Sequence, residues 1–353
     1  MQKTIQLQHH FDDYECMWNG IEDLYIEKTS EQLPPSFFFS MASFGSFCYL
    51  KTDKAKIKRM VVLGDGRTRQ MYQFLAPIVG FDYHFCEFKS FAQAIKKAKK
   101  EVDDEHPVVL GALDMYYLSY FSTMYHAEHI PFHYFMMTGY DDKAEVITLL
   151  DCGRQEPQQL SYSNLEKAWN CSYDGLSKPF TLCTVRMNSD KNKDRIAKEV
   201  LREKAERFLN PPVGFIGYKG MEKFIKELPE WKIRLSKEEY DKVLFNMVQF
   251  YGTVPTIPNV LRGSEEPDEV NFCGGFDKIS RILYDLGKEY GYNIWLSAAK
   301  WFANGADVIA EITNVIVDYL ANKKDRTDKL PELFTHVKDV LINGFSIILE
   351  NNE

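Results

Sequence analysis

The stretch HYFMMTGYDDKAEVITLLD, residues 133–151, decides the fold of the N-terminal half of the chain. Its first part, His133 to Tyr140, is apolar and aromatic and predicts a buried strand. Its last part, Glu145 to Asp151, is rich in Val, Ile and Leu and predicts a second strand. The Gly-Tyr-Asp-Asp-Lys segment between them is a turn, so the two strands form a hairpin. His133 therefore opens one strand of a pair, and Asp151 ends the other.

The sequence around this hairpin alternates between helical and strand patterns. Apolar residues at helical spacing predict helices over residues 16–28, 69–79, 90–100 and 163–169. Runs of apolar and aromatic residues predict strands over residues 60–63, 81–88, 107–114 and 180–185. Residues 36–50 fit a buried helix that continues into a strand. This half of the chain therefore belongs to the α+β class.

The pattern changes near residue 190, beyond which strand signals nearly vanish. Helices are predicted over residues 190–210, 220–226, 236–251, 276–290, 293–304, 306–321 and 331–349. Ser236, three residues before Glu239, fits an N-cap with the glutamate of a capping box. We therefore expect an α+β domain over residues 1–188, followed by an all-α helical domain over residues 189–353.

The bulk composition is that of an ordinary globular protein. The 353 residues suffice for two domains, 45% of them are hydrophobic, and the net charge is −8. No basic stripe occurs, so nucleic acid is not an expected partner. No apolar run reaches the roughly 18 residues of a membrane span, and the N-terminus lacks the apolar core of a signal peptide. We expect a cytoplasmic protein with no membrane contact, in which thiols stay reduced.

Seven cysteines are scattered along the chain, and none forms a Cys-x-x-Cys pair. Neither a disulfide framework nor a thiolate zinc site is therefore indicated. Cys16 differs from the others because it lies at the start of a predicted helix, where the helix dipole stabilises a thiolate. The alternative is a cysteine that only packs, which is the commoner state of a free thiol. Cys152 is a rival thiol, but a strand end lacks the helix dipole.

Cys16, His133 and Asp151 supply the three groups that a thiol nucleophile needs. An imidazole takes the thiol proton and later passes it to the leaving group. A carboxylate on the far ring nitrogen fixes the tautomer. Each of the three residues lies at the end of a predicted helix or strand, where the backbone can hold it. Glu15 opposes this interpretation if its negative charge points inward, because it would disfavour a thiolate at Cys16.

Several motifs follow one another in order: Phe44-Gly45, Asp114-Met-Tyr-Tyr-Leu118, His129, then His133 to Asp141, and finally the strand that ends in Asp151. This order resembles the papain-like fold of C39-type peptidases. More closely, it resembles the N-terminal domain family named after butirosin biosynthesis protein H. The helical half resembles the domain commonly fused behind that one, most plainly over residues 220–231. The resemblance covers nearly the whole chain.

The named member of this family is an acyltransferase, and the resemblance implies the same chemistry here. We expect a thiol-dependent acyltransferase of specialised-metabolite or antibiotic biosynthesis. An acyl or aminoacyl group would pass from the phosphopantetheine thioester of an acyl carrier protein to a small-molecule amine. Cys16 would accept the acyl group, His133 would act as base and then as acid, and Asp151 would orient His133. Apart from the phosphopantetheine arm of the donor, no cofactor and no metal are expected.

The oxyanion donor departs from the family pattern. Papain-like enzymes often place a glutamine about six residues before the nucleophile, where it donates to the oxyanion. That position is His10 in this chain, and Gln8 lies two residues earlier. Gln8, His10 and the backbone amide of Cys16 are therefore the candidate oxyanion donors.

The aromatic loop before His133 supplies three candidate substrate contacts, Asp114, Tyr117 and His129. Asp114 follows a buried strand, where a carboxylate can bind an amine or hold a histidine. A capping or turn aspartate is an equal alternative. The spacing His-x-x-His-x-x-x-His that ends at His133 is not a helical zinc pattern, because Pro131 breaks any helix there.

Two other functions remain open. The first is a cysteine peptidase or amide hydrolase of the C39-like type, in which water takes the place of the amine. A deep, closed cleft would favour transfer over hydrolysis. The second is a non-catalytic binding or scaffold protein that retains the fold. The helical half carries apolar faces that serve mainly as core, and part of them would suit a homodimer or a carrier-protein surface: Ile309, Ile312, Ile316 and Tyr319.

Overall fold

The computed structural model describes residues 1–10, 15–172, 177–249, 258–263 and 272–350, and it divides the chain into two compact units. The first unit comprises Met1–Phe38 and Arg67–Ile196, and the second comprises Phe39–Gly66 and Ala197–Glu353. The sequence suggested two continuous domains, 1–188 and 189–353. In the structure, the segment Phe39–Gly66 instead packs with the C-terminal residues.

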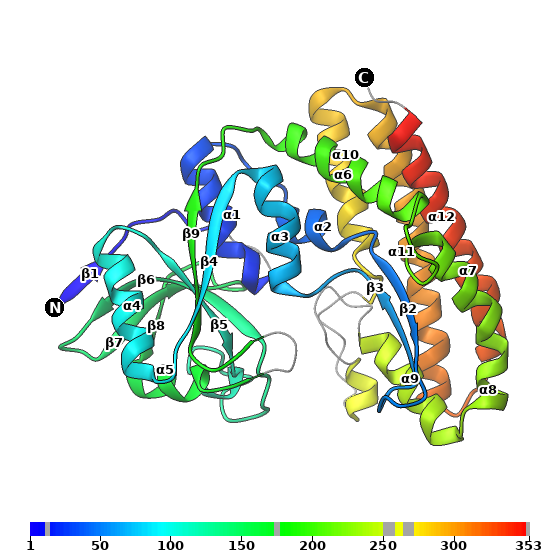
Figure 1. Cartoon of the computed structure of the whole chain (residues 1–353), viewed down its shortest axis with the longest axis horizontal. Helices are drawn as coiled ribbons and strands as arrows, with labels where there is room; N and C mark the ends of the chain where they lie inside the picture. The colour runs from blue at the N-terminus through cyan, green and yellow to red at the C-terminus, as the bar shows by residue number, and fades with distance from the viewer. Residues whose placement is uncertain (11–14, 173–176, 250–257, 264–271, 351–353) are drawn as a thin grey trace. The chain divides into compact units, whose positions relative to one another are not determined.

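The first unit is built on one antiparallel sheet of seven strands (Figure 1). The strands are β1 (Gln2–Thr4), β4 (Phe81–Glu87), β5 (Val108–Leu113), β6 (His133–Asp141), β7 (Val146–Leu150), β8 (Gln158–Ser161) and β9 (Thr181–Met187). Their order is β4-β9-β5-β6-β7-β8, and β1 pairs with the end of β6. The predicted hairpin is confirmed as β6 and β7. The sequence analysis missed β1 and β8, which are short and largely polar.

Four helices accompany this sheet: α1 (Cys16–Thr29), α3 (Thr68–Val79), α4 (Phe91–Asp103) and α5 (Tyr162–Trp169). Alternate residues of β6 point to opposite sides of the sheet, as the pleat requires. Phe135 and Met137 join the core that α4 and α5 cover. Met136 lies between them in sequence and packs against Gly20 of α1. The sheet is therefore covered on both sides near β6, and the α+β class is confirmed.

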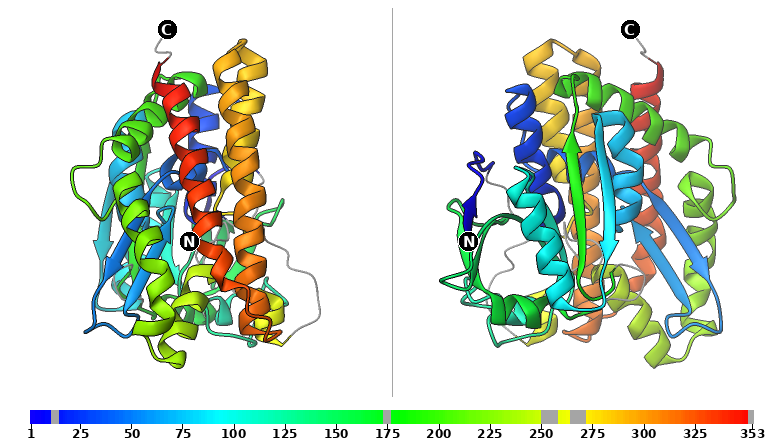
Figure 2. Two further views of the ribbon diagram at one scale, coloured as in Figure 1. Left: turned by 90° about the vertical axis from the view of Figure 1, so that its right-hand side faces the viewer. Right: turned by 60° about the vertical axis from the view of Figure 1, so that its left-hand side comes forward.

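The second unit is helical over its described C-terminal residues, as predicted, and a two-stranded antiparallel ribbon from the N-terminal half packs with it. The ribbon consists of β2 (Phe47–Lys51) and β3 (Arg59–Leu63). Its helices are α7 (Gly217–Glu227), α8 (Trp231–Arg234), α9 (Lys237–Gln249), α10 (Phe276–Tyr290), α11 (Asn293–Leu320) and α12 (Leu330–Glu350). Helices α2 (Phe37–Ser43) and α6 (Lys193–Leu209) connect the units in sequence. Figure 2 shows α10, α11 and α12 running side by side.

Aromatic packing explains why Phe39–Gly66 belongs with the helical unit. Phe44 lies with its ring centroid 5.0 Å from that of Phe276 and 4.9 Å from that of Phe302. The hydroxyl of Tyr49, on the ribbon, donates to Glu227 at the end of α7 at 2.9 Å. These contacts join residues far apart in sequence, which a local pattern of hydrophobicity does not reveal.

The predicted helices of the C-terminal half are largely confirmed, with one correction. The sequence analysis expected separate helices over 293–304 and 306–321, whereas α11 is one continuous helix through Gly305. A side chain on Gly305 would meet the ring of Phe276 at 2.4 Å, so this glycine serves close packing and is not a break. The predicted capping box is present, because Ser236 and Glu239 bond each other's backbone amides. Within the described parts of the chain, no helix combines the length and the apolarity needed to cross a membrane.

Candidate active site

His133 and Asp151 meet where the sequence predicted, at neighbouring ends of the hairpin. His133 is the first residue of β6, and Asp151 directly follows β7. The Nε2 atom of His133 lies 2.9 Å and 2.7 Å from the two carboxylate oxygens of Asp151. Both side chains are buried. Such a carboxylate holds the ring in one orientation and stabilises its protonated form.

The thiol of Cys16 lies close enough to His133 to act on the charge of its ring. Because Nε2 already faces Asp151, Nδ1 is the ring nitrogen left for a thiol. Burial disfavours a charged ring, but the influence of Asp151 and Cys16 outweighs it and raises the pKa of His133 to about 10. The structure thus places Cys16 near the hydrogen-bonded pair of His133 and Asp151.

The position of Cys16 follows from how α1 packs on the sheet. Cys16 is the first residue of this helix and is half-buried. Gly20, one turn further on, lies so close to β6 that an added Cβ atom would meet the Cβ atom of Met136 at 2.5 Å. Met136 is three residues from His133 on the same strand. The glycine therefore lets the helix that carries the thiol approach the strand that carries the imidazole.

Tyr120 is a site residue that the sequence analysis did not select. Its hydroxyl donates to Asp151 Oδ2 at 2.6 Å, so the carboxylate accepts hydrogen bonds from both a ring and a phenol. The phenol is buried beside the negative Asp151, and both effects raise the pKa of Tyr120 well above its usual value, which keeps the hydroxyl a donor. The neighbouring ring of Phe121 packs edge-on against His133 at 5.3 Å. The only sequence signal for Tyr120 is its place in the aromatic loop.

Cys152 also lies at this site but in a different state. It is buried, and burial together with the charges of Asp151, Cys16 and Glu15 raises its pKa well above the usual value. Cys152 is therefore a neutral thiol, unsuited to be the nucleophile. Its sulfur, one His133 nitrogen and one Asp151 oxygen lie within 4.8 Å of one another. In the part of the chain that the structure describes, this is the one such cluster of three groups that could hold a metal.

Glu15, the residue that argued against a thiolate, is buried at the N-cap position of α1. Its charge acts on Cys152, so the carboxylate lies near the site. A protonated His133 ring favours a negative charge in this region, whereas the carboxylate of Glu15 disfavours one. Cys16 is among the groups that raise the pKa of His133, so the thiol and the ring act on each other directly.

The two side chains expected as oxyanion donors lie before α1. Gln8 is exposed. The ring of His10 faces α1, with Nε2 3.7 Å from Glu22 Oε2, and its backbone amide donates to Asp23 at 2.5 Å. Their role as oxyanion donors stays a prediction. The third candidate, the backbone amide of Cys16, lies at the N-terminus of a helix, where amides have no intrahelical acceptor.

Asp114, Tyr117 and His129 form a cluster of their own in the loop. The Asp114 carboxylate accepts from the backbone amides of Tyr116 and Ile130, at 3.1 and 3.0 Å, and lies 2.6 Å from the His129 ring. The His129 ring stacks on Tyr116 at 4.1 Å, and Tyr117 packs edge-on against both rings. These contacts agree with the alternative of a capping aspartate that also holds a histidine. Substrate binding by the three residues stays a prediction.

Two of the three histidines of the loop share an aromatic neighbour, because the rings of His126 and His129 both stack on Tyr116. The His126 ring stacks between Tyr125 and Tyr116, at 4.0 and 5.0 Å. His129 faces Asp114, whereas the described contacts of His133 are with Cys16, Asp151 and Phe121.

Two phenols lie near the thiol on the α1 side of β6. Tyr134 follows His133, and burial with the charge of Cys16 raises its pKa to about 12, against a hydrogen bond from Thr68. The hydroxyl of Tyr72, on α3, donates to the backbone oxygen of Met17 at 2.6 Å. Both phenols therefore stay protonated, so the side chains near Cys16 include two neutral hydroxyl groups.

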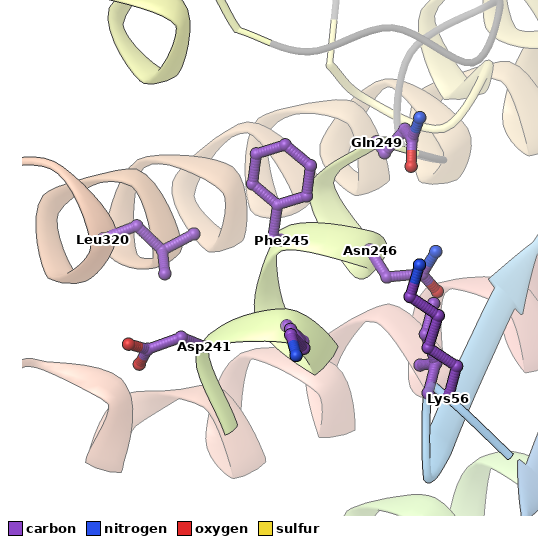
Figure 3. Close-up of a pocket in the computed structure, with 8 residues that line it drawn as sticks. Lys56, Asp241, Phe245, Asn246, Gln249 and Leu320 are labelled. Carbon is purple, nitrogen blue, oxygen red and sulfur yellow. The ribbon is translucent and has the colours of Figure 1, made fainter. Parts of the chain in front are cut away.

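The helical unit contains a pocket of about 410 Å³ (Figure 3). Its walls combine charged, amide and apolar side chains: Lys56, Ile57, Asp241, Lys242, Phe245, Asn246, Gln249 and Leu320. The set contains neither a cysteine nor a histidine. This pocket therefore lacks the groups for thiol chemistry, and the site in the first unit is the stronger candidate.

Two family models match parts of the chain. Residues 15–152 match the family model described as butirosin biosynthesis protein H, N-terminal. Residues 164–254 match a second model, a domain of unknown function, DUF4872. The first match includes Cys16, His133 and Asp151. No curated protein matches the sequence.

Proposed function

Residues 15–152 form a domain of the butirosin biosynthesis protein H, N-terminal family, and from this we propose that the chain is a thiol-dependent acyltransferase. The donor would be the phosphopantetheine thioester of an acyl carrier protein, and the acceptor a small-molecule amine. The family is named after a biosynthetic protein, which supports a role in the synthesis of a specialised metabolite. The buried His133–Asp151 pair, with Cys16 at the start of α1 close enough to act on the His133 ring, is the observation that carries the proposal.

The first half-reaction forms an acyl-enzyme. With its raised pKa, His133 holds the thiol proton of Cys16 as an imidazolium, and the thiolate attacks the carbonyl carbon of the donor thioester. The tetrahedral intermediate then expels the donor sulfur, which takes the proton back from His133. A new thioester on Cys16 replaces the donor thioester, so one carbon–sulfur bond forms and one breaks. Backbone amides at the start of α1 would stabilise the negative oxygen of the tetrahedral intermediate.

The second half-reaction transfers the acyl group to nitrogen. His133 removes a proton as the amine attacks the Cys16 thioester, and returns it to the departing thiolate. The product is an amide, and Cys16 is again a thiol. In both halves His133 becomes an imidazolium, whose charge faces the buried Asp151. Tyr120 donates to the same carboxylate and so helps to hold it in place.

The test uses acetyl-pantetheine as donor and glycinamide as acceptor, with the full-length protein. Release of the pantetheine thiol is followed over time, and the products are identified by mass spectrometry. The proposal predicts an acetylated amine that requires Cys16. A Cys16→Ala variant that folds and still forms the amide would overturn it.

The same experiment separates transfer from hydrolysis. The triad would serve a cysteine peptidase or amide hydrolase equally well, with water in place of the amine. If the rate of thiol release does not depend on glycinamide and the product is only acetate, the chain is a hydrolase. Absence of turnover, together with an unreactive Cys16, would assign it to the non-catalytic members of the fold.

A further inference from the structure

A second histidine–carboxylate pair lies directly beside the candidate triad. The Nδ1 atom of His9 lies 2.7 Å from Asp23 Oδ2 on α1. Its Nε2 atom lies 3.1 Å from the backbone oxygen of Asp151. The exposed fractions of the His9 and Asp23 side chains are only 5% and 0%. A buried imidazole thus joins the helix of Cys16 to the residue that orients His133.

The protonation of His9 follows from its two partners. A backbone oxygen only accepts, so Nε2 must carry a hydrogen and donate to Asp151. Burial disfavours a charged ring, but the hydrogen bond and charge of Asp23, aided by Asp151, outweigh it and raise the pKa of His9. The ring therefore holds its donor proton toward Asp151 over the range in which most proteins work. The Asp23 carboxylate is itself held by the backbone amide of His10, at 2.5 Å.

The position of Asp23 on α1 explains how the His9–Asp23 pair links this helix to the sheet. Asp23 follows Cys16 by seven residues, about two turns, so both lie on the same side of α1. Gly20, between them, lies close against Met136 of β6. The helix is therefore held to the strand of His133 at Gly20, and to the end of β7 through Asp23 and His9. Asp151 is held at both ends, its carboxylate by His133 and its carbonyl by His9.

We infer that His9 and Asp23 are a positioning pair, which keeps α1, the helix that carries the thiol of Cys16, and the carboxylate of Asp151 in place around the His133 ring. This inference rests on the proposed function, because it gives the pair a role in activating Cys16. A purely structural link between helix and sheet has no reason to end on Asp151 itself. Neither residue touches the reacting atoms, so both act through Asp151 and α1.

The test measures the rate at which iodoacetamide alkylates Cys16, by peptide mass spectrometry across a range of pH. His9→Ala removes both hydrogen bonds. It is expected to lower the Cys16 rate about tenfold or more near neutral pH, because loss of alignment at a reacting group costs up to about a hundredfold. It should also move the pH profile of alkylation upward, since the imidazolium no longer holds the thiolate as well. His84→Asn, an exposed histidine on β4, is the control and should leave both quantities unchanged.

Two further variants separate positioning from folding. In His9→Gln the amide nitrogen reaches the place of Nε2 and can still donate to Asp151, so most of the Cys16 rate should return. In His9→Asn the shorter amide can reach only Asp23, so the rate should stay low. Thermal unfolding of all variants checks that each is folded. Equal rates and pH profiles for the Gln and Asn variants would overturn the inference, as would a folded His9→Ala variant with the wild-type profile.

The outcomes for the pair and for the proposed function are distinct. If wild-type Cys16 is alkylated no faster than the other cysteines, the activated thiol of the proposed function fails, and the positioning role fails with it. If wild-type Cys16 is fast and His9→Ala leaves it equally fast, only the positioning role fails.

Discussion

The Nε2 atom of His133 lies within hydrogen-bonding distance of both carboxylate oxygens of Asp151, and both side chains are buried. Asp151→Asn would keep the shape but remove the charge that stabilises the imidazolium. We predict that thiol release from acetyl-pantetheine falls by about 10²- to 10⁴-fold, as for loss of a triad carboxylate. Asp142→Asn is the matched control, because Asp142 follows His133 by nine residues on the same hairpin but lies at its partly exposed turn. A turnover within a few fold of wild type in Asp151→Asn would remove Asp151 from the mechanism.

Tyr120→Phe tests the second hydrogen bond to the same carboxylate. The change removes only the hydroxyl that donates to Asp151 at 2.6 Å. Because hydrogen bonds to charged groups contribute about 1.5–3 kcal/mol, we expect the free energy of unfolding to fall by that amount. Chemical denaturation measures it. Tyr125→Phe, in the same loop, serves as control and should change stability far less. A Tyr120→Phe variant as stable as the control would show that the bond contributes nothing.

Gly20→Ala tests the close approach of α1 to β6. On an isolated helix alanine is more favourable than glycine by about 1 kcal/mol, so propensity alone predicts stabilisation. We predict the opposite sign, a loss of about 1–3 kcal/mol, because the new methyl group would meet the Cβ atom of Met136 at 2.5 Å. The alkylation rate of Cys16 should fall as well, since the helix must move. In Gly66→Ala, the control, the added methyl group meets open space, and both quantities should stay near wild type.

The raised pKa of His133 predicts a dependence of stability on pH. The pKa rises from its ordinary value of 6.5 to about 10 in the folded protein. The folded state therefore binds this proton more tightly than the unfolded state does. The stabilisation is complete below about pH 6.5 and is lost as the pH rises toward 10.

Denaturant unfolding of the wild type and of His133→Gln, near pH 6.5 and near pH 10, isolates this contribution. The difference in free energy of unfolding between the two proteins should shrink as the pH rises. A difference that is constant over this range would show that His133 is not charged in the folded protein.

Local patterns were sufficient to predict the hairpin and the helix that hold the candidate triad. His133 begins one run of apolar residues and Asp151 follows the end of another. A turn separates the two runs, so the sequence places both residues at strand ends of one hairpin. Cys16 begins a stretch with helical spacing, and α1 begins at that residue. Periodicity and turn residues are short-range signals, and each of these three positions depends on them.

The surroundings of the site could not be predicted in the same way. His9 contacts both Asp23 and Asp151 across the tertiary fold, and no spacing rule relates the three residues. Tyr120 was one of several tyrosines in a loop without regular structure. The expected role of Asp114 illustrates the same limit, because its carboxylate is committed to the loop backbone and to His129.

The most direct test of the central claim is the intact mass of the protein after brief incubation with acetyl-pantetheine in the absence of an amine. An acyl-enzyme mechanism predicts the mass of one acetyl group, which peptide mapping assigns to Cys16 and which glycinamide removes. His133→Gln should acquire the acetyl group far more slowly, and Cys16→Ala should not acquire it at that peptide. A folded wild-type protein that remains unmodified, or is acetylated at another cysteine in preference to Cys16, would contradict the account.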